Sequence, residues 1–391
     1  MKRMSFALAA TAMMAACSRA DGISAVDTPR PSATGFAQTS ISTPASTHTP
    51  LLPTAIPPSP TPVSPVITLD TVASLSTFMS FAEGELVRSL AFSPDGTALA
   101  AAVGDEARTV RLHQVASGLP LRTLEGHKSI VWGLAFSPDG RLLASASRDH
   151  TAKVWDWRTE SLLRSLDFPN RTIEGYIDEV VSVAFSPDSQ TLAVGGVDQW
   201  LNAVIWTYAV DSWKSLMNLA EFWNIPDIAF SPDGAMLVGG GTSRNVRVWR
   251  VNDGAEQFSL YHAGQVSSIA ISPDGSTAAT GLCEASTETG QCTRGAVWLW
   301  NLDTGTLIQK LSDFPEGVEG VAFSLDGSLV IAGSRDGTVR AYATSDYQPL
   351  LVTTSPLGPS PAVILALALS PDGRFVATGG VGKVNLWRVE P

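Results

Sequence analysis

The chain has 391 residues, of which 44% are hydrophobic and 16% charged, and its formal net charge is −11. An acidic protein has no general attraction for phosphate backbones, so the composition argues against nucleic-acid binding. The same charge opposes adsorption to an anionic lipid surface, so membrane association requires a separate anchor. Eleven Trp residues and few charges are more typical of an all-β protein than of a helical one.

Residues 1–16 have the pattern of a secretory signal. Lys2 and Arg3 precede an apolar run at residues 6–16, which is too short to span a bilayer. The run leads into Met-Ala-Ala-Cys at residues 14–17, which resembles the lipobox of bacterial lipoproteins, with Met an unusual choice at its first position. The resemblance implies cleavage before Cys17, acylation of that residue and an extracytoplasmic protein held at the membrane by lipid alone. Ordinary secretion with cleavage after Ala16 is the alternative.

Residues 17–70 are predicted to form a disordered tether behind this anchor. Between residues 18 and 66, 26 of 49 residues are Ser, Thr or Pro, and no charged side chain occurs between Arg30 and Asp70. Such a segment cannot bury enough apolar surface to offset the entropy of ordering it. The simplest interpretation is that this segment is a spacer between a membrane and a folded domain.

Two further cysteines, Cys283 and Cys292, lie in one short polar stretch. In an oxidising compartment they are predicted to form a disulfide, worth roughly 2.5–3 kcal/mol in the chain-entropy model. Free thiols are the alternative. A metal site is not expected, because two Cys without a nearby His cannot fill a tetrahedral coordination sphere. No cofactor is expected either.

A repeat of seven copies occupies residues 71–391. Ser-Pro-Asp-Gly, or a near copy of it, begins at Ser93, Ser137, Ser186, Ser231, Ser272, Ser324 and Ser370, at spacings of 41–52 residues. Pro, Asp and Gly in this order favour a tight turn, and the spacing matches four-stranded propeller blades. Copy three has Ser189 in place of Gly, and copy six has Leu325 in place of Pro.

The residues before each turn predict a buried inner strand. Six positions before each turn Ser stands a β-branched residue: Val87, Val131, Val180, Ile225, Val266, Val318 and Ile364. The last copy has only four residues after Trp387, whereas residues 75–81 precede the first copy without a repeat of their own. We therefore predict an all-β, seven-bladed propeller, closed by pairing of this N-terminal strand with the last blade.

Copy two resembles the WD-repeat family, with Glu-Gly-His ending at residue 127 and Lys-Val-Trp-Asp at residues 153–156. In that family His, Ser or Thr, Asp and Trp form a hydrogen-bonded tetrad, and the matching positions here are His127, Ser145, Asp149 and Trp155. The His, Ser and Asp could be mistaken for a catalytic triad, but their spacing is that of the family's tetrad. The other copies keep only parts of it. The Ser-Pro-Asp-Gly turn is also shared with Tol-type envelope propellers.

No catalytic motif is apparent, so recognition is the predicted activity and the chain is not expected to be an enzyme. In WD-type rings, partners often contact the face where the first strands begin. They also contact the turn between the second and third strands. Five residues next to the Val/Ile positions, together with Arg148, which precedes Asp149, are therefore predicted to bind a protein or peptide partner: Arg88, Ile130, Trp132, Val181, Leu365 and Arg148.

The leading hypothesis is a monomeric, non-catalytic WD-type scaffold that is lipid-anchored outside the cytoplasmic membrane and binds protein or peptide partners. A Tol-type or barrel-assembly envelope lipoprotein is one alternative. A propeller enzyme, such as a glycan lyase or a quinoprotein, is the other, and it would need acid, base or cofactor groups clustered in the channel.

Overall fold

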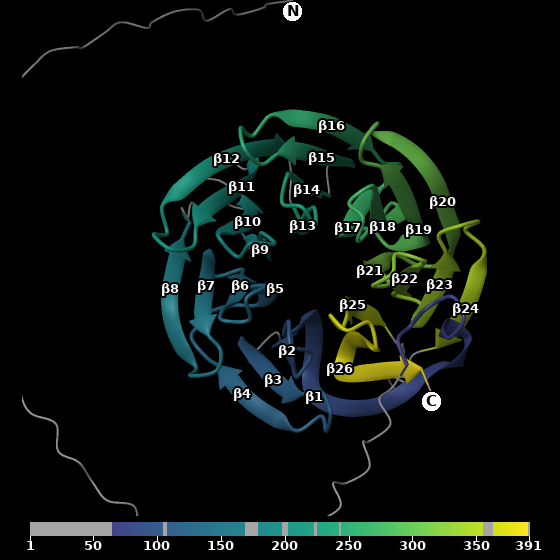
Figure 1. Ribbon diagram of the computed structural model, residues 1–391, viewed down its shortest axis with the longest axis horizontal. Helices are drawn as coiled ribbons and strands as arrows, with labels where there is room; N and C mark the ends of the chain where they lie inside the picture. Colours follow the sequence, from purple (N-terminus) through teal and green to yellow (C-terminus); the bar gives the residue numbers. More distant parts are fainter. Residues whose placement is uncertain are drawn as a thin grey trace, which may run out of the picture. The chain divides into compact units, whose positions relative to one another are not determined.

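The computed structural model describes residues 65–104, 108–168, 179–197, 202–222, 225–241, 244–354 and 363–389. These residues form β-strands, one short 3-10 helix (η1, Val72–Ser74) and no α-helix. No helix in these ranges is long and apolar enough to cross a membrane. The strands are arranged in a ring in which consecutive repeats are neighbours (Figure 1). The predicted signal, Cys17 and the tether up to residue 64 lie outside the described residues.

Repeats two to six each form an antiparallel sheet of four strands in sequence order. Repeats two and three contain β5 (Val131–Phe136), β6 (Leu143–Ser147), β7 (Thr151–Asp156), β8 (Ser161–Asp167), β9 (Val180–Phe185), β10 (Thr191–Val197), β11 (Asn202–Ala209) and β12 (Ser215–Phe222). Repeats four to six contain β13 (Asp227–Phe230), β14 (Met236–Gly240), β15 (Asn245–Arg250), β16 (Glu256–Tyr261), β17 (Gln265–Ile271), β18 (Thr277–Ser286), β19 (Cys292–Asn301), β20 (Thr306–Phe314), β21 (Val318–Phe323), β22 (Leu329–Ser334), β23 (Thr338–Ala343) and β24 (Pro349–Thr354).

The first and seventh repeats share a single sheet of six strands, in the order β25-β26-β1-β2-β3-β4. Its strands are β1 (Leu75–Phe92), β2 (Ala98–Val103), β3 (Thr109–Gln114), β4 (Pro120–Leu124), β25 (Ile364–Leu369) and β26 (Phe375–Val389). The predicted number of seven blades is therefore wrong, because the described strands form six hydrogen-bonded sheets. The reason is that β1 runs without a break from its pairing with β26 to its pairing with β2 (Figure 1).

The pairing that closes the ring joins the first and the last strand of the described chain, β1 and β26, in the middle of this sheet. The first part of β1 pairs antiparallel with the end of β26, with Leu75 opposite Val389 and Phe81 opposite Val384. Trp387 Nε1 donates to Thr378 Oγ1 at 2.9 Å, so β26 itself folds back near Gly382, whose φ is +73°. Each end strand thus gains a hydrogen-bonded neighbour, which removes two exposed sheet edges.

The Ser-Pro-Asp-Gly turns share one hydrogen-bond pattern that explains the motif. In all seven, the Ser hydroxyl donates to the Asp carboxylate at 2.5–2.6 Å. In the first turn the Ala98 amide donates to Ser93 Oγ at 2.9 Å, and the Gly96 amide donates to the Ser93 carbonyl. Every inner strand ends at such a turn, so the turns lie on one face of the ring, here called the turn face. The opposite face, where the inner strands begin, is called the mouth face.

Candidate functional site

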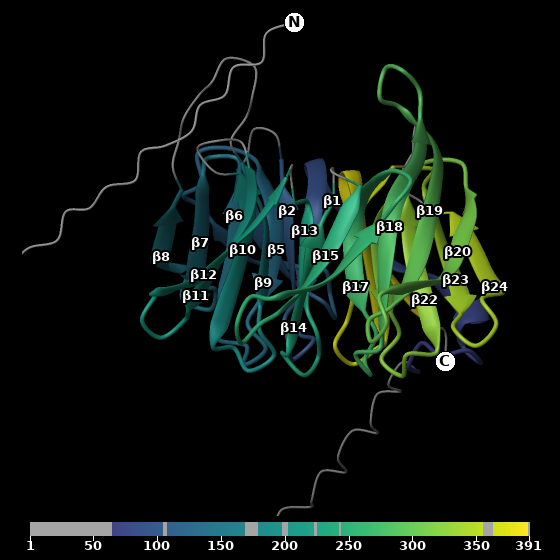
Figure 2. The same cartoon turned by 90° about the horizontal axis from the view of Figure 1, so that it is seen from above.

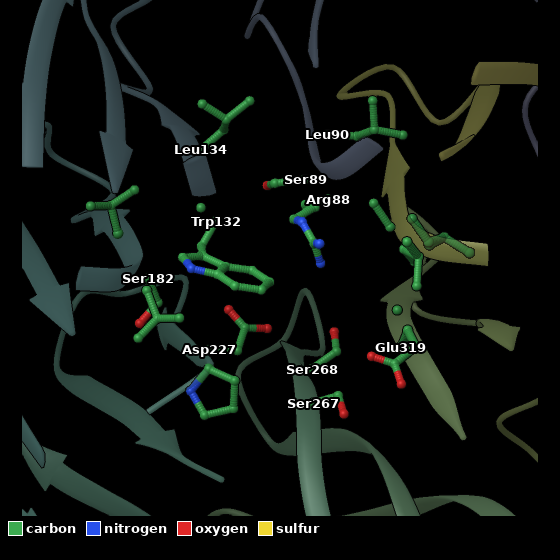
Figure 3. A pocket seen from close by; sticks show the side chains of 18 of the residues that line it. Arg88, Ser89, Leu90, Trp132, Leu134, Ser182, Asp227, Ser267, Ser268 and Glu319 are labelled. Atoms are coloured by element: carbon green, nitrogen blue, oxygen red, sulfur yellow. The ribbon is translucent and has the colours of Figure 1, made fainter. Parts of the chain in front are cut away.

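A cavity of about 370 Å³ opens where the inner strands begin, in the centre of the ring (Figure 3). One residue from each repeat, at the position directly after the Val/Ile residue, lines it: Arg88, Trp132, Val181, Pro226, Ser267, Glu319 and Leu365. We call these seven residues the mouth. Four of the six residues predicted to bind a partner belong to the mouth.

The other two predicted partner residues lie beside the mouth without lining the cavity. Ile130 is half-buried, and its carbonyl accepts a hydrogen bond from the Arg148 amide at 2.9 Å. The Arg148 guanidinium pairs with Glu179, with Nε–Oε1 of 3.0 Å, and Glu179 does line the cavity. Arg148 therefore acts on the site through Glu179 rather than directly.

Trp132 and Arg88 form a cation–π pair in the cavity wall. The Arg88 guanidinium carbon lies 4.4 Å from the centre of the Trp132 ring, and both side chains are half-buried (Figure 3). Such a pair presents a planar, partly apolar surface with an embedded positive charge, which is the composition of many binding hot spots.

Two carboxylates of the cavity are held by arginines. Glu179 pairs with Arg148, and Glu319 pairs with Arg335 at 2.6 Å. Burial raises the pKa of both Glu179 and Glu319, against the opposing effect of the arginine beside each. These two carboxyl groups are thus fixed in ion pairs.

Asp227 is a cavity residue that the sequence reasoning missed. Its carboxylate accepts hydrogen bonds from the amides of Ile228, at 2.9 Å, and Ile269, at 2.7 Å. Asp227 keeps some surface toward the cavity, and burial nevertheless raises the pKa of its carboxyl to about 7. The only signal in the sequence was an acidic residue two positions after Ile225, where other repeats have Ser, Gly or Ala.

The four residues of the predicted tetrad are hydrogen-bonded in series. His127 Nδ1 lies 2.9 Å from Asp149 Oδ2 and must donate, because a carboxylate only accepts. In the neutral ring His127 Nε2 then accepts from the Ser145 hydroxyl at 2.7 Å, and Trp155 Nε1 donates to Ser145 Oγ at 2.9 Å. Ser145 is fully buried, so the group serves packing within the repeat rather than nucleophilic attack.

Other repeats contain altered forms of this tetrad. In repeat five, Trp300 Nε1 donates to His262 Nε2 at 3.0 Å, and Thr280 Oγ1 lies 2.9 Å from the same nitrogen. Burial lowers the pKa of His262 to about 4, so the ring is neutral at physiological pH. His262 precedes Val266 by four residues, as His127 precedes Val131, and this spacing was the overlooked signal.

Repeat one replaces the tetrad with an ionic group. Glu83 takes the position of the tetrad His, four residues before Val87, and is only 3% exposed. Its carboxylate contacts His113 Nε2 at 2.6 Å and Arg111 Nη1 at 3.0 Å. His113 pairs with Leu99 as Trp155 pairs with Leu143, so it takes the position of the tetrad Trp and is matched by a compensating change at Glu83.

Cys283 and Cys292 are joined by a disulfide between β18 and β19, with a Cα–Cα distance of 5.7 Å. In the described part of the chain, no group of three or more His, Cys, Asp or Glu side chains could hold a metal ion.

A ring of antiparallel sheets with an internal His-Ser-Asp-Trp tetrad defines a WD-type β-propeller. The model of the WD domain, G-beta repeat, matches residues 74–114, 118–156, 168–202, 217–250, 305–342 and 351–388, which is more than half of the chain. The chain therefore belongs to the WD-repeat family. Residues 251–304, most of repeat five, are not matched.

Curated relatives share parts of this ring. The chain is 30% identical over 127 residues to the Periodic tryptophan protein 2 homolog of Schizosaccharomyces pombe, covering 32% of this chain and 13% of that protein. It is 28% identical over 127 residues to the small ribosomal subunit protein RACK1z of Oryza sativa, covering 31% and 35%. It is 37% identical over 112 residues to an uncharacterized WD repeat-containing protein of Synechocystis, covering 28% and 29%. The chain thus spans about a third or less of the length of these relatives.

Proposed function

We propose that this protein is a non-catalytic scaffold that binds a protein or peptide partner at the mouth. The observation that carries the proposal is that one aligned position from all seven repeats lines a single cavity. The mouth combines the Trp132–Arg88 pair with the apolar side chains of Val181, Pro226 and Leu365, which suits a partner segment with both apolar and charged groups. Membership of the WD-repeat family, with relatives such as RACK1z, supports a binding role.

The carboxylates of the cavity do not favour a catalytic role. Glu179 and Glu319 are neutralised by arginines, and both oxygens of Asp227 accept backbone amides. A general acid and base pair needs two groups that can exchange protons with a substrate, whereas Glu179 and Glu319 are committed to ion pairs, which leaves only Asp227 of these three, with its pKa of about 7.

Anchoring belongs to the same proposal. We expect Cys17 to be lipidated and the ring to lie outside the cytoplasmic membrane, on the tether that begins at that residue. Mass spectrometry of the mature N-terminus tests this, with Cys17→Ser as the variant. An unmodified N-terminus, or an unchanged membrane fraction for Cys17→Ser, would remove the anchor from the proposal.

Partner binding is tested by quantitative affinity purification of the full chain from cells that produce it natively. The variants are Trp132→Ala and, as a matched aromatic control, Tyr261→Ala, because Tyr261 is 63% exposed on the outermost strand of repeat four. We expect specific partners to be depleted at least tenfold by the first change and retained after the second. Equal recovery with both variants would exclude the mouth as the binding site.

A further inference from the structure

Among the hairpins that the structure describes in full, the one between β18 and β19 projects furthest on the mouth face (Figure 2). These two strands have ten residues each, whereas their counterparts β6 and β7 have five and six. We call residues 283–294 the arm. It lies within residues 251–304, which the family model does not match, and it extends the second and third strands of repeat five beyond the length that they have in repeat two.

The arm is held in one conformation by several bonds. Besides the Cys283–Cys292 disulfide, Arg294 pairs with Glu284 at 2.9 Å, and the Glu284 side chain is 9% exposed. At the tip, the Thr287 amide donates to the Gln291 carbonyl at 2.8 Å. Since a polar hairpin buries little apolar surface of its own, these constraints must offset the entropy of ordering it.

The base of the arm is packed against the mouth. Gly295 leaves no room for a Cβ, because the Glu316 carbonyl lies against it. A Cβ on Gly317 would lie 3.6 Å from Cys292 Sγ and 3.3 Å from Glu319 Oε1. The disulfide and the mouth residue Glu319 thus flank the same glycine, and the arm continues the surface of the mouth.

The tip has a distinct chemical character. Residues 286–291 are all exposed and contain hydroxyl and amide side chains, one carboxylate (Glu288) and no apolar side chain. Glu316 adds a second carboxylate at the base. Such a surface contacts a partner through hydrogen bonds and opposite charge rather than through apolar burial.

We propose that the arm is a second contact element of the binding face, and that one protein partner bridges the mouth and the arm with a basic segment against Glu288. This inference rests on the proposed function. Because the arm is already ordered in the free protein, little conformational entropy is lost when the partner binds. This preorganisation raises the affinity.

Site-specific photo-crosslinking of the full chain in its native cells tests the inference. The photoreactive residue p-benzoyl-phenylalanine replaces Thr289, which is exposed at the tip and leaves Glu288 in place, Ser267 in the mouth or Asp303 as the control. Asp303 is exposed in the turn after β19, at the other end of the same strand. We expect one and the same protein, identified by mass spectrometry, from the first two positions and not from Asp303.

The possible failures are distinguishable. A protein crosslinked from Ser267 alone, or different proteins from Ser267 and Thr289, would overturn the role of the arm and leave the proposed function standing. No crosslink from Ser267 would overturn both.

Affinity for the purified crosslinked protein gives the quantitative test. We expect Glu288→Lys to weaken binding about tenfold and Asp303→Lys, the same charge change on the turn face, to leave it unchanged. The double variant Cys283→Ser/Cys292→Ser keeps every tip side chain, and we expect several-fold weaker binding from the loss of preorganisation. If Glu288→Lys and Asp303→Lys changed the affinity equally, the change would come from net charge and not from a contact at the arm, which would contradict the inference.

Discussion

The Asp227 carboxylate of repeat four accepts a hydrogen bond from the Ile269 amide of repeat five, with an Oδ2–N distance of 2.7 Å. The same aligned position links two other pairs of repeats. Ser182 Oγ donates to the Ile225 carbonyl at 2.9 Å, and Ser268 Oγ accepts from the Val321 amide at 3.2 Å. Side chains on the inner strands therefore join repeats three to six directly, between sheets that share no strand pairing.

Replacing Asp227 should destabilise the ring strongly. In Asp227→Ala the amides of Ile228 and Ile269 lose their acceptor, and an unsatisfied amide costs about 1–3 kcal/mol. We expect the free energy of unfolding in urea to fall by about 2–4 kcal/mol. The exposed Asp303→Ala is the control, and a loss of similar size there would contradict this role for Asp227.

Asp227 should also make stability depend on pH in an unusual direction. Burial raises the pKa of its carboxyl from 3.8 to about 7, so the folded chain binds this proton more tightly than the unfolded chain does. Its stabilising contribution is complete below about pH 4 and is lost as the pH rises through 7. We expect the free energy of unfolding of Asp227→Asn, relative to the wild type, to increase between about pH 4 and pH 8. Thermal unfolding at several pH values measures this difference, and groups common to both proteins cancel. A flat difference would show that Asp227 stays ionised.

Much of the mouth could be predicted because the side chains of a strand alternate between its two faces. Once the Val/Ile positions identified the buried face of each inner strand, the next residue had to point the other way, into the channel. The sheet count could not be predicted in this manner. The number of sheets depends on whether β1 continues without a break from its pairing with β26 to its pairing with β2. These two partner strands lie almost 300 residues apart in the sequence, and no local sequence pattern predicts that one strand joins them.

The role of Glu83 was hidden for a related reason. Glu83 and His113 each depart from the pattern of repeat two, and each departure alone looks like decay of the repeat. Only their contact, at 2.6 Å, shows that the two changes compensate one another, while Arg111, at the position of Lys153, lies 3.0 Å from the same carboxylate. Asp227 was not predicted because the role of an acidic residue on an inner strand depends on which amides donate to it, and the sequence does not show these.

The Glu83 group should behave as a coupled unit. Glu83→Ala leaves a guanidinium and a buried imidazole without their carboxylate, and removing one partner of a buried pair costs about 3–5 kcal/mol. We expect a double-mutant cycle with His113→Ala to show a coupling of about 1–3 kcal/mol in urea unfolding. Additive effects would contradict the coupling, and the exposed Glu125→Ala should change stability little.

Asp149 should stabilise repeat two only while it is charged. Burial by itself raises its pKa, but hydrogen bonds from His127, Thr151 and the Lys128 amide outweigh burial and hold the pKa of Asp149 far below the usual range. A carboxyl with a lowered folded pKa contributes stability above its unfolded pKa of about 3.8, and this is lost as the pH falls. We expect Asp149→Asn to lose about 2–4 kcal/mol at pH 7 and about 1 kcal/mol less than that near pH 3, compared with the exposed Asp167→Asn. An equal loss at both pH values would mean that the charge is not required.

One of the seven turns ends in Ser189 instead of Gly, and a hydrogen bond of this side chain explains why Ser is accommodated there. Its φ is +62°, a conformation that costs a non-glycine residue about 1 kcal/mol, and its hydroxyl accepts from the Asp139 amide of the preceding repeat at 3.0 Å. The two effects oppose each other, so we expect Ser189→Gly to change the free energy of unfolding by less than about 1 kcal/mol. Ser189→Ala keeps the strained backbone and loses the bond, so it should be destabilised by about 1–2 kcal/mol. Chemical denaturation of the two variants measures both values, and equal stability would show that the bond to Asp139 contributes nothing.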